Sequence, residues 1–176
     1  MIHRAVLVLL LCCAWPPFTH AASLTLLTAS DVSALVKPPL HGERIIALWA
    51  LDCAYCEPNL AALAKLQRAH PKKIELVLVA TDGPGQHAAV ASRIKKMGMA
   101  AYPARLYAEP TPERIDYLID PDWGGETPRT LVIRADGTRT AISGELTTDQ
   151  LKKIEPTFVN WRQWLLSPFD TVRSPG

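Results

Sequence analysis

The sequence lacks a strong excess of charge of either sign. Its 19 lysines and arginines nearly balance 17 aspartates and glutamates, which leaves a formal charge of +2 over 176 residues. Nucleic-acid-binding domains usually carry a clustered excess of basic residues, so this balance gives no support to that class. Internal repeats and low-complexity tracts are also missing. With 48% hydrophobic residues, the composition indicates one ordinary globular domain with a real core.

The sequence also lacks a hydrophobic run long enough to span a bilayer as a helix, which needs roughly 20 residues. A shorter run near the start, residues 5–15, ends at Pro16-Pro17. Arg4 precedes it, and Thr19-His20-Ala21 resembles a cleavage site for an export signal. We therefore expect a signal peptide at 1–21 and a periplasmic protein, with a retained membrane anchor as the alternative.

Cysteine is scarce, and cleavage would make it scarcer. Of four cysteines, Cys12 and Cys13 lie in the expected signal, where the residues before them do not suit lipidation; only Cys53 and Cys56 would remain. A lone Cys-x-x-Cys pair in an exported protein is more typical of redox chemistry than of structural cross-linking. A zinc site needs about four ligands. The remaining histidines have no partner spacing: His41, His70 and His87.

The two cysteines follow a continuous apolar run. Residues 44–51 have the composition of a strand buried on both faces, and residues 57–68 have apolar residues at helical spacing. Cys53 and Cys56 are therefore expected in the first turn of a helix, where unpaired N–H groups and the helix dipole favour a thiolate. Their spacing places both sulfurs on one face, close enough to bridge.

The rest of the chain is expected to alternate strands and helices, which implies an α/β fold with a sheet flanked by helices. The domain is expected to cover 22–166, including a C-terminal helix with an apolar stripe (Phe158, Trp161, Trp164, Leu165), before a tail at 167–176. The other expected elements are a strand at 24–28, a helical turn at 30–36 capped by Ser30, a strand at 73–81, a helix at 86–97, short strands at 105–107 and 115–119, a hairpin at 130–143, and a helix from 149 capped by Thr147 or Thr148.

Two motifs resemble the thioredoxin superfamily, most closely the exported proteins of the TlpA/ResA/DsbE type. One is Leu48-Trp49-Ala50-x-x-Cys53-x-x-Cys56, and the other is Thr127-Pro128 followed by a strand and Asp136-Gly137. The resemblance covers roughly residues 40 to 152. It implies a thioredoxin-like fold with a central mixed sheet and a thiol–disulfide oxidoreductase.

The resemblance also implies roles for single residues. Cys53 is the expected nucleophile and Cys56 the resolving thiol, while Pro128 is expected to be cis and Thr127 to present its backbone to the partner polypeptide. The expected substrate contacts also include Trp49 and Tyr55. No cofactor and no metal is expected. The implied partners are exported thiol or disulfide proteins, with a membrane electron donor.

The chain departs from the family at the acids around the dithiol. Thioredoxin has a buried acid where this chain has Ala47, and TlpA-type proteins often have a glutamate where it has Asn59. Glu57 and Glu126 are candidate substitutes as proton acceptor for the inner thiol. Asp52 stands next to Cys53, where a negative charge opposes thiolate formation; Asp52 and Glu57 are thus the expected pKa-tuning residues.

Three functions remain open at this point. The first is a reductase that serves cytochrome c maturation or another exported thiol protein. The second is an oxidase or isomerase of folding proteins. The third is a copper-binding module that uses the same two sulfurs, because soft thiolates suit Cu(I).

Overall fold

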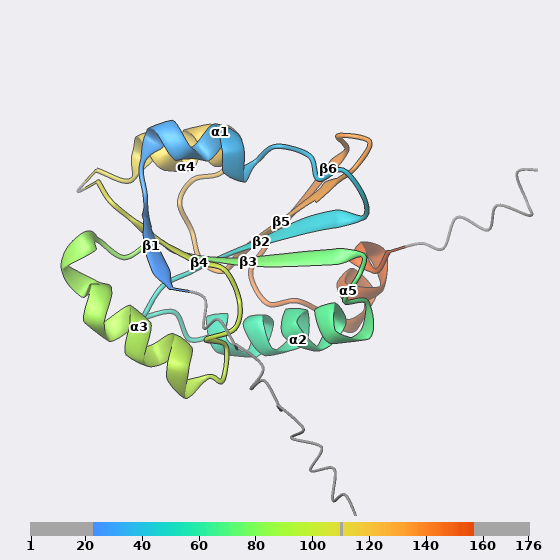
Figure 1. Ribbon diagram of the computed structural model, residues 1–176, viewed down its shortest axis with the longest axis horizontal. Helices are drawn as coiled ribbons and strands as arrows, with labels where there is room; N and C mark the ends of the chain where they lie inside the picture. Colours follow the sequence, from blue (N-terminus) through green and yellow to red (C-terminus); the bar gives the residue numbers. More distant parts are fainter. Residues whose placement is uncertain (1–22, 110, 157–176) are drawn as a thin grey trace, which may run out of the picture.

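The computed structural model describes residues 23–109 and 111–156 (Figure 1). The expected signal peptide, the apolar stripe near the C-terminus and the expected tail lie outside these residues. The described part forms one six-stranded mixed sheet with the strand order β1-β4-β3-β2-β5-β6. The strands are β1 Leu24–Leu27, β2 Glu43–Trp49, β3 Ile74–Ala80, β4 Ala104–Tyr107, β5 Arg129–Arg134 and β6 Arg139–Ser143.

Helices cover both faces of this sheet (Figure 1). Strands β1 to β4 run parallel, whereas β5 pairs antiparallel with β2, and β6 antiparallel with β5. Helices α1 and α4 lie on one face, and α2, α3 and α5 lie on the other. The helices are α1 Val32–Leu35, α2 Cys56–Ala69, α3 His87–Lys96, α4 Glu113–Ile119 and α5 Thr148–Ile154, with 3-10 turns η1 Ala29–Asp31 and η2 Pro84–Gln86.

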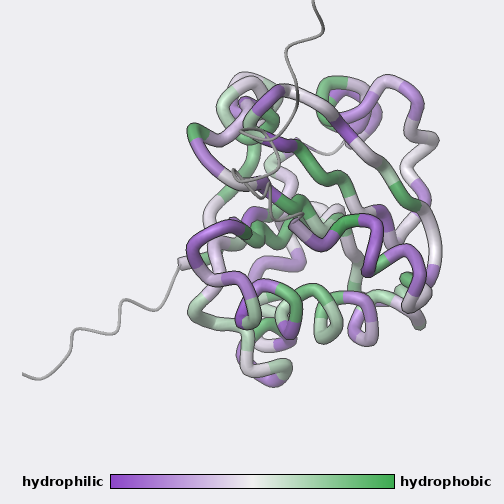
Figure 2. The backbone as a smooth tube through the Cα atoms, turned by 90° about the vertical axis from the view of Figure 1, so that its right-hand side faces the viewer, coloured by the Kyte–Doolittle hydropathy of each residue, from purple (hydrophilic) through white to green (hydrophobic). Residues whose placement is uncertain are grey.

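Strand β2 is covered by helices on both of its faces. Alternate side chains of a strand point to opposite faces. Ile45 and Trp49 pack in the core under α2 and α3, whereas Ile46 and Leu48 pack in the core under α1 and α4. Both cores therefore need apolar residues from β2, which explains the continuous apolar run. In Figure 2 hydrophobic stretches run through the central strands, while the outer helices alternate between hydrophobic and hydrophilic residues.

Two sequence-based expectations about local structure are wrong. Residues 115–119 belong to helix α4 and not to a strand: Ile115 and Ile119, four residues apart, are both buried on one helical face. Ser30 is not a helix cap, because it lies inside η1, and Thr28 takes the cap position. The Thr28 N–H donates to the Asp31 carboxylate at 3.0 Å, which closes that turn.

The other elements expected within residues 23–109 and 111–156 are confirmed with small changes of bounds. The hairpin of β5 and β6 turns at Ala135 to Thr138, and Thr147 rather than Thr148 caps α5, where its hydroxyl accepts from the Gln150 N–H at 3.2 Å. The parallel pairing of β2 with β3 leaves Trp49 opposite Ala80 at the carboxyl end of both strands. The dithiol loop and the loop after β3 therefore leave the sheet side by side.

Candidate functional site

The two cysteines form a disulfide at the entry to α2. Cys56 is the first residue of the helix, whereas Cys53 lies before it, in the turn that follows β2. The expectation that both lie in the first helical turn is therefore wrong for Cys53. The chain first turns through residues 51–55, where the Cys56 N–H donates to the Cys53 carbonyl at 3.4 Å. The Cα atoms of the pair are 5.4 Å apart.

The two sulfurs differ in their access to solvent. Cys56 is 1% exposed and packs in the core under α2, together with Leu60. Cys53 is half-buried, and Asp52 and Tyr55 on either side of it are exposed. A partner that approaches the disulfide from solvent thus meets the Cys53 side of the pair.

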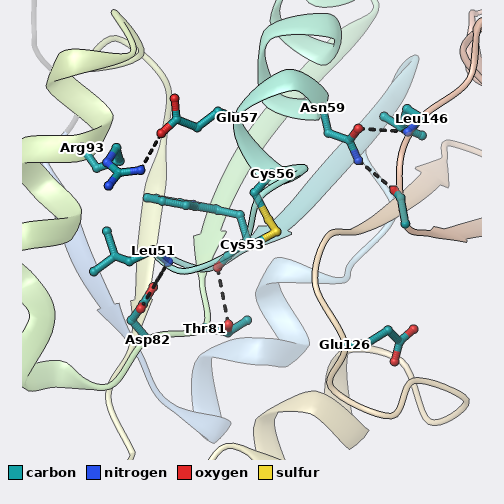
Figure 3. Close-up of a disulfide and its surroundings, with 12 residues drawn as sticks. Leu51, Cys53, Cys56, Glu57, Asn59, Thr81, Asp82, Arg93, Glu126 and Leu146 are labelled. Atoms are coloured by element: carbon teal, nitrogen blue, oxygen red, sulfur yellow. Dashed lines mark hydrogen bonds and ion pairs between the residues drawn. A yellow bond between two sulfur atoms is a disulfide. The ribbon is translucent and has the colours of Figure 1, made fainter.

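The loop that carries Cys53 is held by the residues that follow β3. The Thr81 N–H donates to the Trp49 carbonyl at 2.9 Å, and the Leu51 N–H donates to the Asp82 carboxylate, whose two oxygens lie 3.2 and 3.3 Å away. Figure 3 shows Asp82 beneath this loop, with its carboxylate directed at Leu51. Burial raises the pKa of Asp82 above its ordinary value, and the charge of Asp52 acts in the same direction.

The peptide bond between Thr127 and Pro128 is cis, as the resemblance implied. Pro128 is buried and lines one small gap together with Cys56 and Asn59, so the structure brings this loop against the inner cysteine. Thr127, beside it, is half-buried. The Pro128 carbonyl accepts from the Gly144 N–H at 2.9 Å, which ties the loop to the end of β6.

The segment before Pro128 is fastened to the rest of the domain. Trp123 is buried in the core under α4, and its indole N–H donates to the Glu126 carbonyl at 2.8 Å. Arg129 forms an ion pair with Asp120 at 2.5 Å and donates to the Ser143 hydroxyl at 2.6 Å. The loop opposite the dithiol therefore has a defined position.

The two aromatic residues expected at the substrate surface occupy different environments. Tyr55 is 56% exposed beside the disulfide and remains a candidate contact. Trp49 is 1% exposed and packs in the core under α2. Its ring is covered by the protein, so we place Trp49 in the core and not among the contacts of a partner.

Neither glutamate proposed as a proton acceptor points at the disulfide in Figure 3. Glu57 forms an ion pair with Arg93 of α3 at 2.5 Å. Glu126 accepts a hydrogen bond from the Ser143 hydroxyl, which lowers the pKa of this carboxyl, and lies 3.5 Å from Arg129. Each carboxylate is thus occupied by a partner on another element.

Asn59, which replaces the glutamate of TlpA-type proteins, is an internal clamp. Its side chain is nearly buried, at 4% exposed. The amide nitrogen donates to the Gly144 carbonyl and the amide oxygen accepts from the Leu146 N–H, each at 2.9 Å. One turn after Cys56, this residue therefore connects α2 to the segment between β6 and α5 (Figure 3).

Asp82 is the residue at this site that sequence reasoning missed. The sequence patterns gave it no role at the site, yet it follows β3, whose carboxyl end lies at the same edge of the sheet as the dithiol loop. An acid directly after a buried parallel strand is a detectable signal, because ligand and catalytic groups of α/β folds gather at that edge.

Within 23–109 and 111–156, no group of three or more histidine, cysteine, aspartate or glutamate side chains is arranged to hold a metal ion. No helix among the same residues is both long and apolar enough to cross a bilayer.

Solved structures of other proteins share this architecture. A thioredoxin-family thiol:disulfide interchange protein of Chlorobium tepidum is 23% identical over 69% of this chain and 81% of its own, with a TM-score of 0.52. The chain has a thioredoxin-like fold. A secreted disulfide oxidoreductase of Mycobacterium tuberculosis, described as homologous to DsbE of E. coli, is 20% identical over 65% of this chain and 81% of its own, with a TM-score of 0.51. No protein-family model and no curated protein matches the chain.

Proposed function

We propose that this thioredoxin-like protein is a thiol–disulfide oxidoreductase that exchanges disulfides with exported proteins through Cys53 and Cys56. The observation that supports this most directly is the asymmetric pair at the start of α2, with Cys53 accessible and Cys56 1% exposed. One sulfur can reach a partner while the other stays inside, as a two-step exchange requires.

The proposed reaction moves two electrons. In the reduced protein the Cys53 thiolate attacks one sulfur of a partner disulfide; that bond breaks, a mixed disulfide forms, and the second partner sulfur leaves as a thiolate that takes up a proton. The Cys56 thiolate then attacks the Cys53 sulfur and releases the first partner sulfur. The partner is reduced, and the protein ends with the Cys53–Cys56 disulfide.

We propose the reducing direction. A protein disulfide is a strong oxidant when its reduced thiolate form is stabilised. The residue next to Cys53 is the exposed acid Asp52, whose negative charge opposes a thiolate. A membrane electron donor would return the disulfide to the dithiol. Export, with cleavage of a signal at 1–21, places the protein where partner disulfides persist.

Trapping variants test the proposal. Cys56→Ser should accumulate mixed disulfides with a disulfide-bonded partner protein on non-reducing gels, whereas Cys53→Ser should not, because it lacks the attacking thiolate. Wild type should reduce the partner with turnover when a small dithiol is supplied. Trapping by Cys53→Ser alone would reverse the assigned roles. Stoichiometric binding of Cu(I) by the reduced protein without any disulfide exchange would contradict the proposed function in favour of metal binding.

A further inference from the structure

We propose that Asp82 is a positioning residue for Cys53, which holds the dithiol loop through the Leu51 amide and places a negative charge beside it. The inference rests on the proposed exchange function, since it concerns the same two sulfurs. Both oxygens of the Asp82 carboxylate lie within hydrogen-bond distance of the Leu51 nitrogen, at 3.2 and 3.3 Å.

The Asp82 carboxylate accepts a hydrogen bond from the chain just beyond the last backbone bond between β2 and the segment after β3. Strand β2 ends at Trp49, whose carbonyl still accepts from the Thr81 N–H at 2.9 Å. Two residues later the chain has turned away from β3, and a side chain takes over: Leu51 is held by Asp82 and not by backbone. The path of the chain from Leu51 to Cys53 is therefore held by this side chain together with the Cys53 N–H, which donates to the Ala50 carbonyl at 3.3 Å.

Other charges lie on the elements around this loop. On the loop that carries Pro128, Glu126 lies 3.5 Å from Arg129, so its charge is offset locally. Asp52 of the dithiol loop repels Asp82, and the ion pair of Arg93 and Glu57 connects α3 to α2. The acids Asp52 and Asp82 thus come from two different loops, and both oppose negative charge at Cys53. Since Glu57 is paired with Arg93, its charge is offset locally.

The size of the effect follows from distance. Two residues span at most about 7 Å, so the Asp82 carboxylate lies within roughly 10 Å of the Cys53 backbone, from which the sulfur is one carbon away. At that separation one negative charge raises the titration midpoint of a thiol by about 0.3 unit in water-like surroundings and by about 1 unit at the effective dielectric constant of a protein surface. A less stable thiolate makes the disulfide more reducing, so Asp82 favours the proposed direction of exchange.

The test compares wild type with Asp82→Asn, Asp82→Ala and Asp136→Asn. The amide of Asp82→Asn keeps an oxygen for the Leu51 N–H but removes the charge. Asp136→Asn makes the same chemical change in the turn between β5 and β6, at the far end of β2. For each reduced protein, thiolate absorbance is titrated against pH, and the dithiol–disulfide equilibrium is measured in glutathione buffers.

Asp82→Asn should lower the thiolate midpoint by about 0.3 to 1 unit. At a pH above both midpoints, where reduced Cys53 is a thiolate, the variant's disulfide should be about 2- to 10-fold easier to reduce, which is roughly 10 to 30 mV. Asp136→Asn should match wild type. Asp82→Ala should show the same shift of the thiolate midpoint. It should also exchange with a disulfide-bonded protein at least about threefold more slowly than Asp82→Asn, because the Leu51 N–H loses its acceptor and Cys53 is positioned less well.

An unchanged midpoint and an unchanged equilibrium in Asp82→Asn would overturn the inference, and equal exchange rates for the Asn and Ala variants would overturn its positioning half. If Asp82→Ala does not fold, the isosteric Asp82→Asn still decides the charge effect. Neither the pH titration of the thiolate nor the equilibrium with glutathione needs a protein partner. A shifted midpoint in a protein that exchanges with no partner would therefore sink the proposed function and leave this inference standing.

Discussion

Removal of the Asn59 side chain should destabilise the domain by unpairing two backbone groups. In Asn59→Ala the Leu146 N–H loses its acceptor in a buried position, since Leu146 is 9% exposed. An unpaired buried donor costs about 1 to 3 kcal/mol. The Gly144 carbonyl also loses its donor, but it is half-buried and regains water at a cost of about 1 kcal/mol or less. Together these effects predict a loss of about 1 to 4 kcal/mol in the free energy of unfolding.

Urea unfolding of the oxidised protein measures this loss. Tryptophan fluorescence can follow the transition, because Trp49 and Trp123 are buried in the folded domain. The urea concentration at the midpoint should fall, while the slope of the unfolding free energy against urea stays the same. An unchanged slope would show that both proteins expose the same surface on unfolding and differ only in stability. The Cys53–Cys56 disulfide must stay intact in both proteins so that its constraint on the unfolded chain cancels.

Asn59→Asp separates the two hydrogen bonds. Its carboxylate still accepts from the Leu146 N–H, but it presents a second oxygen to the Gly144 carbonyl. Only the protonated form can donate there, and burial also favours that form, so the pKa of the introduced carboxyl rises on folding. Its stability relative to wild type should be highest below the ordinary aspartate pKa of about 3.9 and fall as pH rises through the folded value.

The reasoning fails under two results. A loss below about 0.5 kcal/mol in Asn59→Ala would mean that water replaces both bonds of the clamp. A stability difference between Asn59→Asp and wild type that does not change with pH would mean that the new carboxyl does not face the Gly144 carbonyl. Asn59→Ala introduces no titratable group, so its difference from wild type should be independent of pH.

Two further changes test other parts of the fold. Asp116 accepts a hydrogen bond from the Tyr107 hydroxyl at 2.6 Å, and burial raises the pKa of Asp116, so wild type should lose stability relative to Asp116→Asn as pH rises above the ordinary aspartate value of about 3.9. Urea unfolding over a pH series checks this, and parallel profiles would contradict it. Gly42→Ala should cost more than about 2 kcal/mol, because φ is +69° and a Cβ would lie 2.1 Å from the Lys73 carbonyl oxygen. The matched change Gly137→Ala, at φ +85° with no atom within 4 Å of the Cβ, should cost only about 1 to 2 kcal/mol, and equal losses would refute the role of the clash.

Strong local patterns in the sequence predicted most of the fold. The apolar run before Cys53 became β2 because a strand with helices on both faces needs apolar residues at every position. The segment around Ile115 was misassigned because it is short and lies between prolines, where a few apolar residues fit a strand as well as a helix. Only its packing against α1 and the sheet selects the helix.

The sequence by itself determined the two cysteines, their spacing, and the strand and helix that flank them, because these depend on residues within a few positions of each other. The tertiary structure decided which residues surround them. Asp82 meets Leu51 only because β3 lies parallel to β2, and Asn59 meets Leu146 only because the segment after β6 returns to α2. Such contacts join residues 31 and 87 positions apart, and no local pattern contains them. Periodicity and spacing are local properties of the chain, whereas the partner of a buried polar group is set by how distant elements pack.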